Sequence, residues 1–180
     1  MKTGSIGIRR ARLEDAVGIA HVHDGAWRFA YRGMLPGVEL ERMISRRGRV
    51  WWERAIRRRV SILVLDFDDE VRGYVTFGAS RARSLPYRFE IYELYVQPEY
   101  IGLGFGTELF RAAQSRFRPS SLDVVVWTLA DNTNACAFYT KLGGRAVATA
   151  EERFGGVSVP KVAFAFDGKK AAAMPPPKRL

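Results

Sequence analysis

The chain has 180 residues, a net charge of +10 and 47% apolar residues, among them eleven Phe and four Trp. This length and apolar content predict one domain with a sizeable core and exclude a disordered protein. A single cysteine, Cys136, excludes an intrachain disulfide framework. No apolar stretch approaches the roughly 18 residues of a membrane span, and the N-terminus lacks a signal sequence, so we expect a cytoplasmic protein.

Hydrophobic periodicity and turn residues predict alternating strands and helices. Helices are expected at 13–29, 38–44, 49–58, 104–117 and 133–142. Strands are expected at 5–10, 60–67, 71–77, 89–97, 122–129, 146–153 and 159–166. The Asp68-Asp69-Glu70 segment is typical of a hairpin turn, and 81–87 is expected to be a loop. This order predicts a mixed α/β sheet with helices on both faces, in one domain over 1–167, followed by a flexible tail over 168–180.

Three glycines at alternate positions, Gly102, Gly104 and Gly106, follow the apolar segment 91–96 and open a helix-like pattern. Glycine lets backbone N–H groups approach an anion, and the first turn of a helix adds unpaired donors. The P-loop is excluded because no Lys follows Gly106, and the dinucleotide fingerprint G-x-G-x-x-G does not match. The loop therefore indicates a phosphorylated ligand, against the alternative of a glycine-rich turn without one.

Residues 131–144 (D-N-T-N-A-C-A-F-Y-T-K-L-G-G) follow the next apolar strand. Their pattern N-x-x-A-x-x-F-Y-x-K-x-G, placed after the loop pattern V-x-P-x-x-x-G-x-G-x-G, resembles the GNAT superfamily of acyl-CoA-dependent N-acyltransferases. Residues 8–16 resemble the opening strand and helix of GNAT members. Residues 27–36 (W-R-F-A-Y-R-G-M-L-P) resemble a W-R-x-x-Y-R-G-x-L-P segment of one small-molecule-like GNAT branch. The resemblance implies a mixed, mostly antiparallel sheet of about seven strands, with helices on both faces and a splay between the two central strands.

The resemblance also implies that acetyl-CoA binds along the strand and the loop. Backbone groups of Leu94, Tyr95 and Val96 would pair with the extended arm of the cofactor as an added strand does. The pyrophosphate would be held by Ile101, Gly102, Leu103, Gly104, Phe105, Gly106 and Thr107, the last through both its hydroxyl and its N–H. Asn132 would contact the cofactor, whereas its position before a helix also favours an N-cap.

Two positions depart from the GNAT pattern. Ile101 stands where Arg or Gln usually precedes the first glycine, which removes a side-chain donor near the pyrophosphate and predicts modestly weaker cofactor affinity. Gly144 stands where the pattern ends in Phe. The backbone donors of the loop are unaffected by either change.

An acyl transfer to an amine needs a polarised thioester carbonyl, a neutral amine and a protonated leaving thiolate. By resemblance, the Leu94 N–H faces the thioester oxygen and Tyr139 is the general acid. A tyrosine of ordinary pKa, near ~10, stays protonated at neutral pH, although Tyr139 next to Phe138 also fits a packing role. We favour Glu93 over Glu90 as the general base, against the alternative of a solvated carboxylate.

The acceptor pocket is expected to be lined by aromatic side chains from the first helices, the strands and the last hairpin, because aromatic faces hold flat or cationic groups. The candidates are Trp27, Tyr31, Tyr92, Trp127 and Phe154, each of which also fits the core. No metal site is expected. His21 and His23 lack the i, i+4 spacing of helical zinc sites, and we interpret them as surface or boundary residues.

The sequence therefore predicts an acetyl-CoA-dependent N-acetyltransferase that acts on a primary amine of a small molecule by direct attack in a ternary complex. There are two alternatives: a non-catalytic CoA-binding protein, and an acetyltransferase that acts on protein N-termini or lysines. A basic nucleic-acid binder is disfavoured, because the arginines are spread out, as in a high-GC bacterial coding bias, and no recognition helix is evident. No membrane partner is expected, and a homodimer is left open.

Overall fold

The structure is a computed structural model that describes residues 6–117 and 123–167. Backbone contacts group the chain into two compact units. Unit 1 consists of Met1–Gly78 with Tyr92–Arg116, and unit 2 consists of Ala79–Ile91 with Phe117–Leu180. The single domain expected over 1–167 stays a prediction, and the tail expected over 168–180 lies outside the described residues.

Seven strands form one hydrogen-bonded sheet in the described part of the chain, in the order β1-β2-β3-β4-β5-β7-β6. They are β1 (Ile6–Arg10), β2 (Ser61–Phe67), β3 (Glu70–Ala79), β4 (Phe89–Val96), β5 (Val124–Leu129), β6 (Arg145–Phe154) and β7 (Val157–Phe166). The β4–β5 pair is parallel, with Phe89 to Ile91 opposite Val124 to Val126. The β1–β2, β2–β3, β5–β7 and β6–β7 pairs are antiparallel. The predicted mixed, mostly antiparallel sheet is confirmed.

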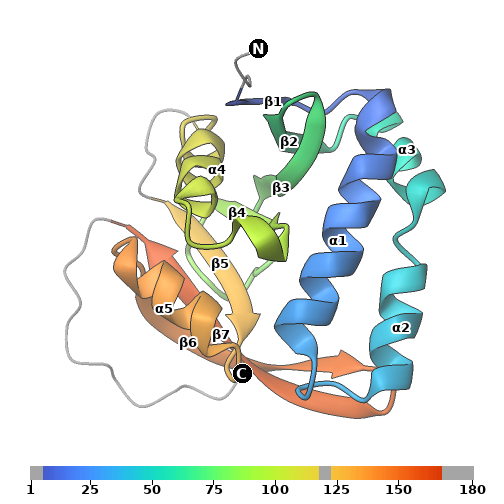
Figure 1. Cartoon of the computed structure of the whole chain (residues 1–180). Helices are drawn as coiled ribbons and strands as arrows, with labels where there is room; N and C mark the ends of the chain where they lie inside the picture. The colour runs from blue at the N-terminus through green and yellow to red at the C-terminus, as the bar shows by residue number, and fades with distance from the viewer. Residues whose placement is uncertain (1–5, 118–122, 168–180) are drawn as a thin grey trace. The chain divides into compact units, whose positions relative to one another are not determined.

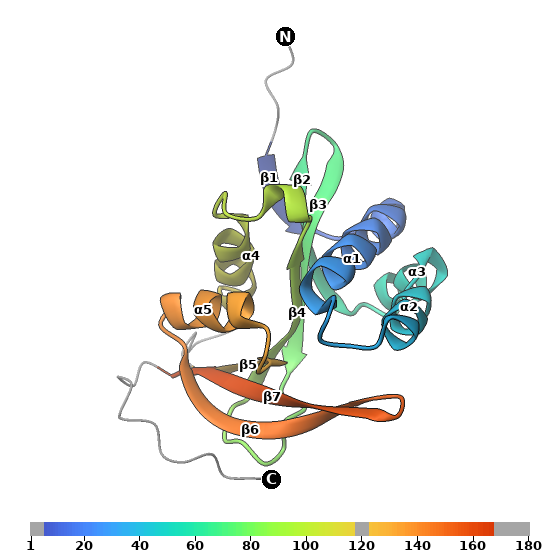
Figure 2. The same ribbon diagram turned by 60° about the horizontal axis from the view of Figure 1, so that its bottom comes forward.

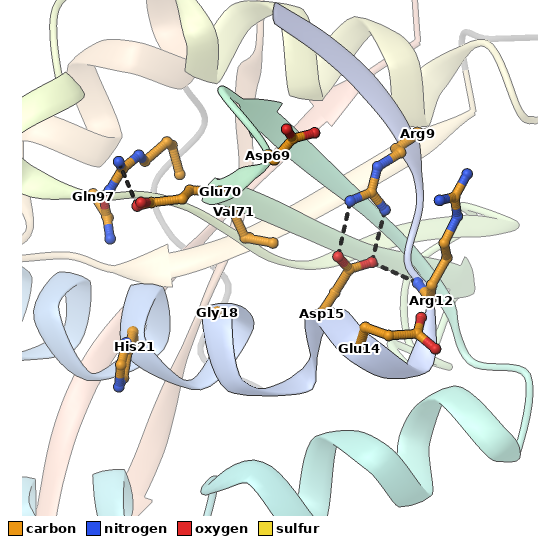
Figure 3. A pocket seen from close by; sticks show the side chains of 11 residues that line it. Arg9, Arg12, Glu14, Asp15, Gly18, His21, Asp69, Glu70, Val71 and Gln97 are labelled. Atoms are coloured by element: carbon orange, nitrogen blue, oxygen red, sulfur yellow. Dashed lines mark hydrogen bonds and ion pairs between the residues drawn. The ribbon is translucent and has the colours of Figure 1, made fainter. Parts of the chain in front are cut away.

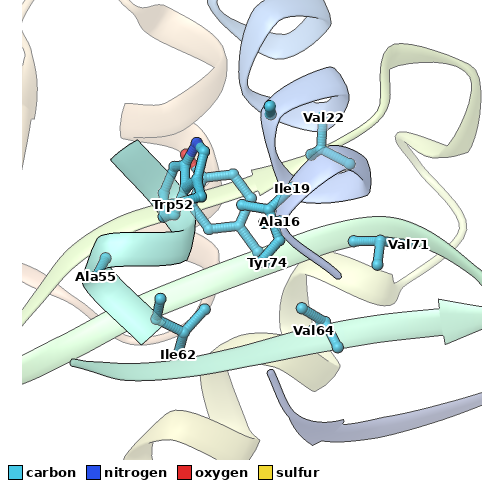
Figure 4. Packing of buried hydrophobic residues seen from close by; sticks show 10 residues of the cluster. Ala16, Ile19, Val22, Trp52, Ala55, Ile62, Val64, Val71 and Tyr74 are labelled. Atoms are coloured by element: carbon cyan, nitrogen blue, oxygen red, sulfur yellow. The ribbon is translucent and has the colours of Figure 1, made fainter. Parts of the chain in front are cut away.

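Unit 1 contains strands β1 to β3, the second half of β4 and most of the helices. These are η1 (Leu13–Asp15), α1 (Ala16–Tyr31), α2 (Gly37–Ser45), α3 (Arg49–Arg57), η2 (Pro98–Tyr100) and α4 (Phe105–Gln114). Within this unit, α1 to α3 cover one face of the strands and α4 covers the other (Figures 1 and 2). Ile19 and Val22 of α1, Trp52 of α3 and Tyr74 of β3 are almost fully buried between helices and strands (Figure 4). Helices α1 and α3 therefore have an apolar core to pack on.

In unit 1 the structure confirms the predicted β2–β3 turn but ends helix α4 earlier than predicted. Asp68 and Asp69, with φ of 55° and 61°, form the turn between β2 and β3, which confirms the predicted hairpin. Two successive residues with positive φ are characteristic of the type I′ turn. The helix predicted to reach residue 117 ends at Gln114 instead. There the Ser115 hydroxyl donates to the Ala112 carbonyl at 2.8 Å, and hydroxyls that bond to nearby backbone favour helix ends.

Unit 2 contains the first half of β4, strands β5 to β7 and helix α5 (Thr133–Lys141). Strands β6 and β7 form a long hairpin, in which Phe154 pairs with Val157 across Gly155 and Gly156 (Figure 2). Gly155 has a φ of 60°. Val125, Ala148 and Ala163 form a buried cluster in this unit. Both strands of the hairpin therefore contribute to the core of this unit.

Candidate active site

The glycine loop enters helix α4 through two left-handed residues. Gly102 has a φ of 88° and Gly104, the N-cap of α4, has a φ of 90°. A Cβ added at either position would have no neighbouring atom within 4 Å. Conformation rather than crowding therefore requires glycine at these two places, because L-residues avoid positive φ.

The loop offers backbone donors that the described residues do not use. The N–H groups of Gly102, Leu103 and Gly104 donate to no described residue, whereas the Thr107 N–H donates to the Gly104 carbonyl at 3.0 Å. The Thr107 N–H thus closes the first helical turn, and its contact with the pyrophosphate stays a prediction. The Ile101 side chain is 53% exposed. Phe105 and Gly106 are partly buried in the first turn of α4.

The second half of β4 contributes Leu94, Tyr95 and Val96 to unit 1. Val96 is buried, while Leu94 and Tyr95 are partly buried. The parallel register with β5 covers Phe89 to Ile91 and includes none of these three residues. The Tyr95 hydroxyl lies 2.8 Å from the hydroxyl of Tyr31 on α1. The Tyr95 side chain therefore belongs to the packing between β4 and α1, and any cofactor role falls to its backbone.

Glu93 is part of a mostly buried polar network in unit 1. Its Oε1 lies 3.0 Å from Arg47 Nη1, and its side chain is only 12% exposed. The Tyr74 hydroxyl donates to Glu93 Oε2 at 3.4 Å and lies 2.9 Å from His23 Nδ1. The alternative of a solvated strand carboxylate is therefore wrong for Glu93, because both oxygens have protein partners.

His23 is fully buried, so its interpretation as a surface or boundary residue is wrong. The i, i+4 rule used on the sequence tests for zinc and says nothing about burial. Its ring lies 4.8 Å from that of Trp27 and 6.0 Å from that of Trp52, measured between centroids. Burial, with a smaller contribution from the Arg47 charge, lowers the pKa of His23 to about 3. The imidazole is therefore neutral at physiological pH.

The hydrogen positions in this network follow from the partners. His23 Nε2 has no partner among the described residues. An orphaned buried lone pair is more readily tolerated than an orphaned N–H, so we assign the proton to Nδ1, which donates to the Tyr74 oxygen. The Tyr74 proton is then directed at Glu93. Burial raises the pKa of Tyr74 well above its ordinary value, so the hydroxyl stays a donor.

Helix α5 in unit 2 is capped at both ends. The Asn132 side chain accepts from the Ala135 N–H at 3.1 Å, which confirms the predicted N-cap. At the other end Gly143 has a φ of 88° and donates to the Thr140 carbonyl, while the Gly144 N–H donates to the Tyr139 carbonyl at 2.9 Å. This pair of bonds is the Schellman motif. Both caps fix the segment that carries Tyr139.

Tyr139 is 6% exposed and packs on aromatic rings of unit 2. Its ring centroid lies 5.8 Å from that of Phe164 and 6.4 Å from that of Phe166. The Phe166 ring also accounts for Gly144, because a Cβ at residue 144 would lie 2.8 Å from Phe166 Cζ and 2.7 Å from the Tyr139 carbonyl oxygen. The Tyr139 ring thus packs in the core of unit 2, and its catalytic role stays a prediction.

Comparison with known proteins identifies the family. A model of the acetyltransferase (GNAT) family matches residues 19–144, which is more than half of the chain. The chain belongs to the GNAT family. It is thereby an enzyme of the N-acyltransferase type, as predicted.

Relatives and solved structures agree with this assignment. The uncharacterized N-acetyltransferase YuaI of Bacillus subtilis (strain 168) is 26% identical over 158 residues, which are 87% of this chain and 90% of YuaI. The PaiA N-acetyltransferase of Thermoplasma acidophilum, solved with coenzyme A, is 18% identical with a TM-score of 0.67, over 90% of this chain and 99% of that one. YncA of Salmonella typhimurium, solved with its cofactor acetyl-CoA, is 18% identical with a TM-score of 0.60, over 94% of this chain and 98% of that one. These two structures share the GNAT fold with this chain.

The aromatic acceptor candidates of this GNAT chain fall in both units. In unit 1, Trp27 and Tyr31 are 8% exposed and in edge contact at 5.0 Å, and Tyr92 is partly buried. In unit 2, the Lys161 ammonium lies 4.8 Å from the ring of Trp127, and Phe154 is buried at the end of β6. Trp27 and Tyr31 therefore lie in the same aromatic cluster as Tyr95, and the core interpretation holds for both.

Glu90 has a different role from Glu93. It is 4% exposed and accepts from the Arg81 backbone N–H at 2.7 Å and from Arg81 Nη2 at 3.1 Å. Both of its oxygens are used to hold the start of the loop after β3. Both oxygens of Glu93 have partners as well, so the choice of Glu93 as the base stays a prediction.

Three members of the Glu93 network were missed from the sequence as functional residues. Tyr74 lies in a buried strand, His23 on α1 and Arg47 between α2 and α3. The only sequence signal is polar groups within apolar patterns, at Tyr74 in the 71–77 strand and at His23 in the first helix. Arg47 sits in a run of arginines and gives no signal of its own.

Unit 1 also contains a polar cavity of about 560 Å³ at the start of α1 and the β2–β3 turn (Figure 3). Arg9 bonds to Asp15 at 2.7 Å, and Arg72 pairs with Glu70 at 2.5 Å. None of the predicted site residues lines this cavity. In the described ranges no group of three His, Cys, Asp or Glu side chains is placed to hold a metal ion. None of the described helices is long and apolar enough to cross a membrane.

Proposed function

We propose that this GNAT enzyme transfers the acetyl group of acetyl-CoA to a primary amine of a small molecule, by direct attack in a ternary complex. The observation that carries this proposal is the pair of left-handed glycines, Gly102 and Gly104, that leaves backbone donors unused at the N-terminus of α4. Unpaired N–H groups and the helix dipole favour a phosphate there. The acetyl-CoA held by the YncA structure supports the same donor.

The residues have distinct roles in this proposal. Residues 101–106 and the Thr107 hydroxyl hold the pyrophosphate, and the backbone of Leu94 to Val96 holds the arm, with the Leu94 N–H on the thioester oxygen. Asn132 serves chiefly as the cap of α5. Glu93 takes the proton of the amine as its nitrogen bonds to the thioester carbon. Tyr139 gives its proton to the sulfur as the C–S bond breaks.

A thioester-cleavage assay with a panel of amines tests the proposal. Release of the CoA thiol should depend on the amine, and mass spectrometry should find the amine heavier by one acetyl group. Acetyl-CoA that binds but is not cleaved with any amine would point to the non-catalytic CoA-binding protein. Acetylation confined to peptides would move the acceptor to protein N-termini or lysines.

The finer predictions on location and assembly stay predictions. We expect the protein to be cytoplasmic and bacterial-like and to have no nucleic-acid or membrane partner, and a homodimer is left open. The net charge of +10 makes the nucleic-acid alternative worth one measurement. It predicts an affinity for DNA or RNA that falls steeply with salt, which fluorescence anisotropy at two salt concentrations would detect.

A further inference from the structure

Arg47 is the charged residue next to the proposed base. It lies in the connection between α2 and α3, where its guanidinium carbon stands 4.0 Å from the ring centroid of Trp51. Its Nη1 lies 3.0 Å from Glu93 Oε1, and its side chain is 32% exposed. The aromatic face and the carboxylate together fix the plane of the guanidinium.

Most of the hydrogen-bonding capacity of Arg47 is unused within the described residues. A guanidinium has five N–H donors, and only its Nη1 has a described partner, Glu93. Arg9 differs, since its guanidinium contacts both Asp15 and Asp66. A guanidinium held in place with donors to spare is suited to a carboxylate, which it binds with two parallel hydrogen bonds.

The acceptor must place its amine at Glu93 if Glu93 is the base, so this inference rests on the proposed function. Whatever is attached to the carbon next to the amine then lies beside Arg47. A second positive group would be repelled there, and a carboxylate would be attracted. We propose that the acceptor is an α-amino acid, whose ammonium and carboxylate match the Glu93 and Arg47 charges.

The reaction balances without any further reactant. The amino acid ammonium loses one proton to become nucleophilic, its nitrogen bonds to the acetyl carbon, and the C–S bond of the thioester breaks. The products are the N-acetyl amino acid, the free CoA thiol and one proton. The carboxylate of the acceptor takes no part in bond making, so Arg47 acts as a specificity residue.

Matched acceptors test the inference. Each amino acid, for example leucine, phenylalanine or alanine, is compared with its own amide, which keeps the side chain and removes the negative charge. We expect kcat/KM for the acid to exceed that for the amide by about 10-fold or more, the usual effect of hydrogen bonds to a charged group. The amine of the amide is less basic, so more of it is neutral and reactive at neutral pH. Intrinsic reactivity therefore favours the amide, and a preference for the acid has to come from the enzyme.

Variants of two adjacent arginines supply the control. Arg47→Gln should bring the acid-to-amide ratio close to one, and the ratio cancels any general damage to Glu93. Arg46→Gln should leave the ratio unchanged, because Arg46 is exposed and its side chain has no described partner. If thermal unfolding shows that Arg47→Gln is not folded, Arg47→Lys replaces it. Lysine keeps the positive charge but cannot form the two parallel hydrogen bonds, so the acid-to-amide ratio should fall.

The outcomes separate the two proposals. An enzyme that acetylates amides as well as acids overturns the amino acid acceptor and leaves the N-acetyltransferase proposal standing. A wild-type preference for acids that survives Arg47→Gln overturns the role of Arg47. An enzyme that acetylates no amine in the panel overturns the proposed function and this inference with it.

Discussion

His23 Nδ1 lies 2.9 Å from the hydroxyl oxygen of Tyr74, and neither side chain is exposed to solvent. This contact connects helix α1 to strand β3 and directs the Tyr74 proton toward Glu93. It joins the stability of unit 1 to the state of the proposed base, so changes at either residue should be visible both in unfolding and in catalysis.

Acid should destabilise the protein through His23. The pKa of His23 is lowered from 6.5 to about 3 in the folded protein, chiefly by burial, so protons bind preferentially to the unfolded chain. This stability is fully present above pH ~6.5 and is lost as pH falls toward about 3, at up to ~1.4 kcal/mol per pH unit. Urea unfolding of wild type and His23→Gln from pH 7 to pH 4.5 checks this. The unfolding free energy of His23→Gln should depend less on pH than that of wild type, whereas His21→Gln, on the exposed face, should behave like wild type. Equal slopes for all three proteins would contradict the burial effect.

Replacing Tyr74 by Phe should weaken both the fold and the base. The change leaves the buried His23 Nδ1–H without an acceptor, which costs roughly 1–3 kcal/mol. It also removes a donor that favours ionised Glu93, so the acid limb of the kcat/KM profile should move to higher pH. Tyr31→Phe, which removes a hydroxyl bonded to Tyr95, is the control. An acid limb that stays in place in Tyr74→Phe would separate Tyr74 from catalysis.

Glu93→Gln should lower the rate by about 10²–10⁴-fold, the usual contribution of a general base. The loss should be steepest at low pH, where little of the amine is already neutral. Stopped-time thioester assays from pH 6 to pH 9 measure this. Glu90→Gln on the same strand removes a buried acceptor for Arg81 and should reduce stability while leaving the shape of the profile intact. Identical profiles for Glu93→Gln and wild type would reject the assignment.

Tyr139→Phe should lower kcat with little change in acetyl-CoA affinity. Phenylalanine keeps the ring that packs on Phe164 and Phe166, so the fold should be retained. The missing hydroxyl leaves the CoA sulfur without its proton donor, so kcat should fall by ~10²-fold or more. Calorimetric titration with CoA and steady-state rates provide the two readouts. Turnover at the wild-type level would remove Tyr139 from the mechanism.

Gly104→Ala should weaken acetyl-CoA binding through the backbone. Alanine at a φ of 90° costs about 1–2 kcal/mol, and the loop can relax away from the conformation that presents its N–H groups. Gly33→Ala is a matched control, because Gly33 has a φ of 83° and equally open space for a Cβ. Both variants should lose similar stability in thermal unfolding, while only Gly104→Ala should lose affinity for CoA. Equal CoA affinity in the two variants would argue against the loop as the pyrophosphate site.

The sequence predicts the parts of this molecule that depend on local patterns. Alternation and turn residues identified the strands, the hairpin turn at Asp68 and Asp69, and the glycine loop, because each depends on a few adjacent residues. The family assignment came from two motifs in a fixed order. Element ends were less predictable, as at Gln114, after which the Ser115 hydroxyl donates to the Ala112 carbonyl.

The surroundings of Glu93 were not predictable in the same way. Arg47, Tyr74 and His23 come from three separate segments of the chain and meet only through tertiary packing. No spacing in the chain relates them to Glu93. The sequence offered Glu93 as one of two strand carboxylates and gave no sign of the partners of either glutamate.

The packing of Phe166 against Gly144 makes the order of mutations matter. A Phe at residue 144, as in the family pattern, would collide with the Phe166 ring and with the Tyr139 carbonyl oxygen. A chain like this one regains the common pattern only after residue 166 becomes smaller and the end of α5 shifts. Each single step passes through a poorly packed intermediate, so the present pair is protected against reversion one residue at a time.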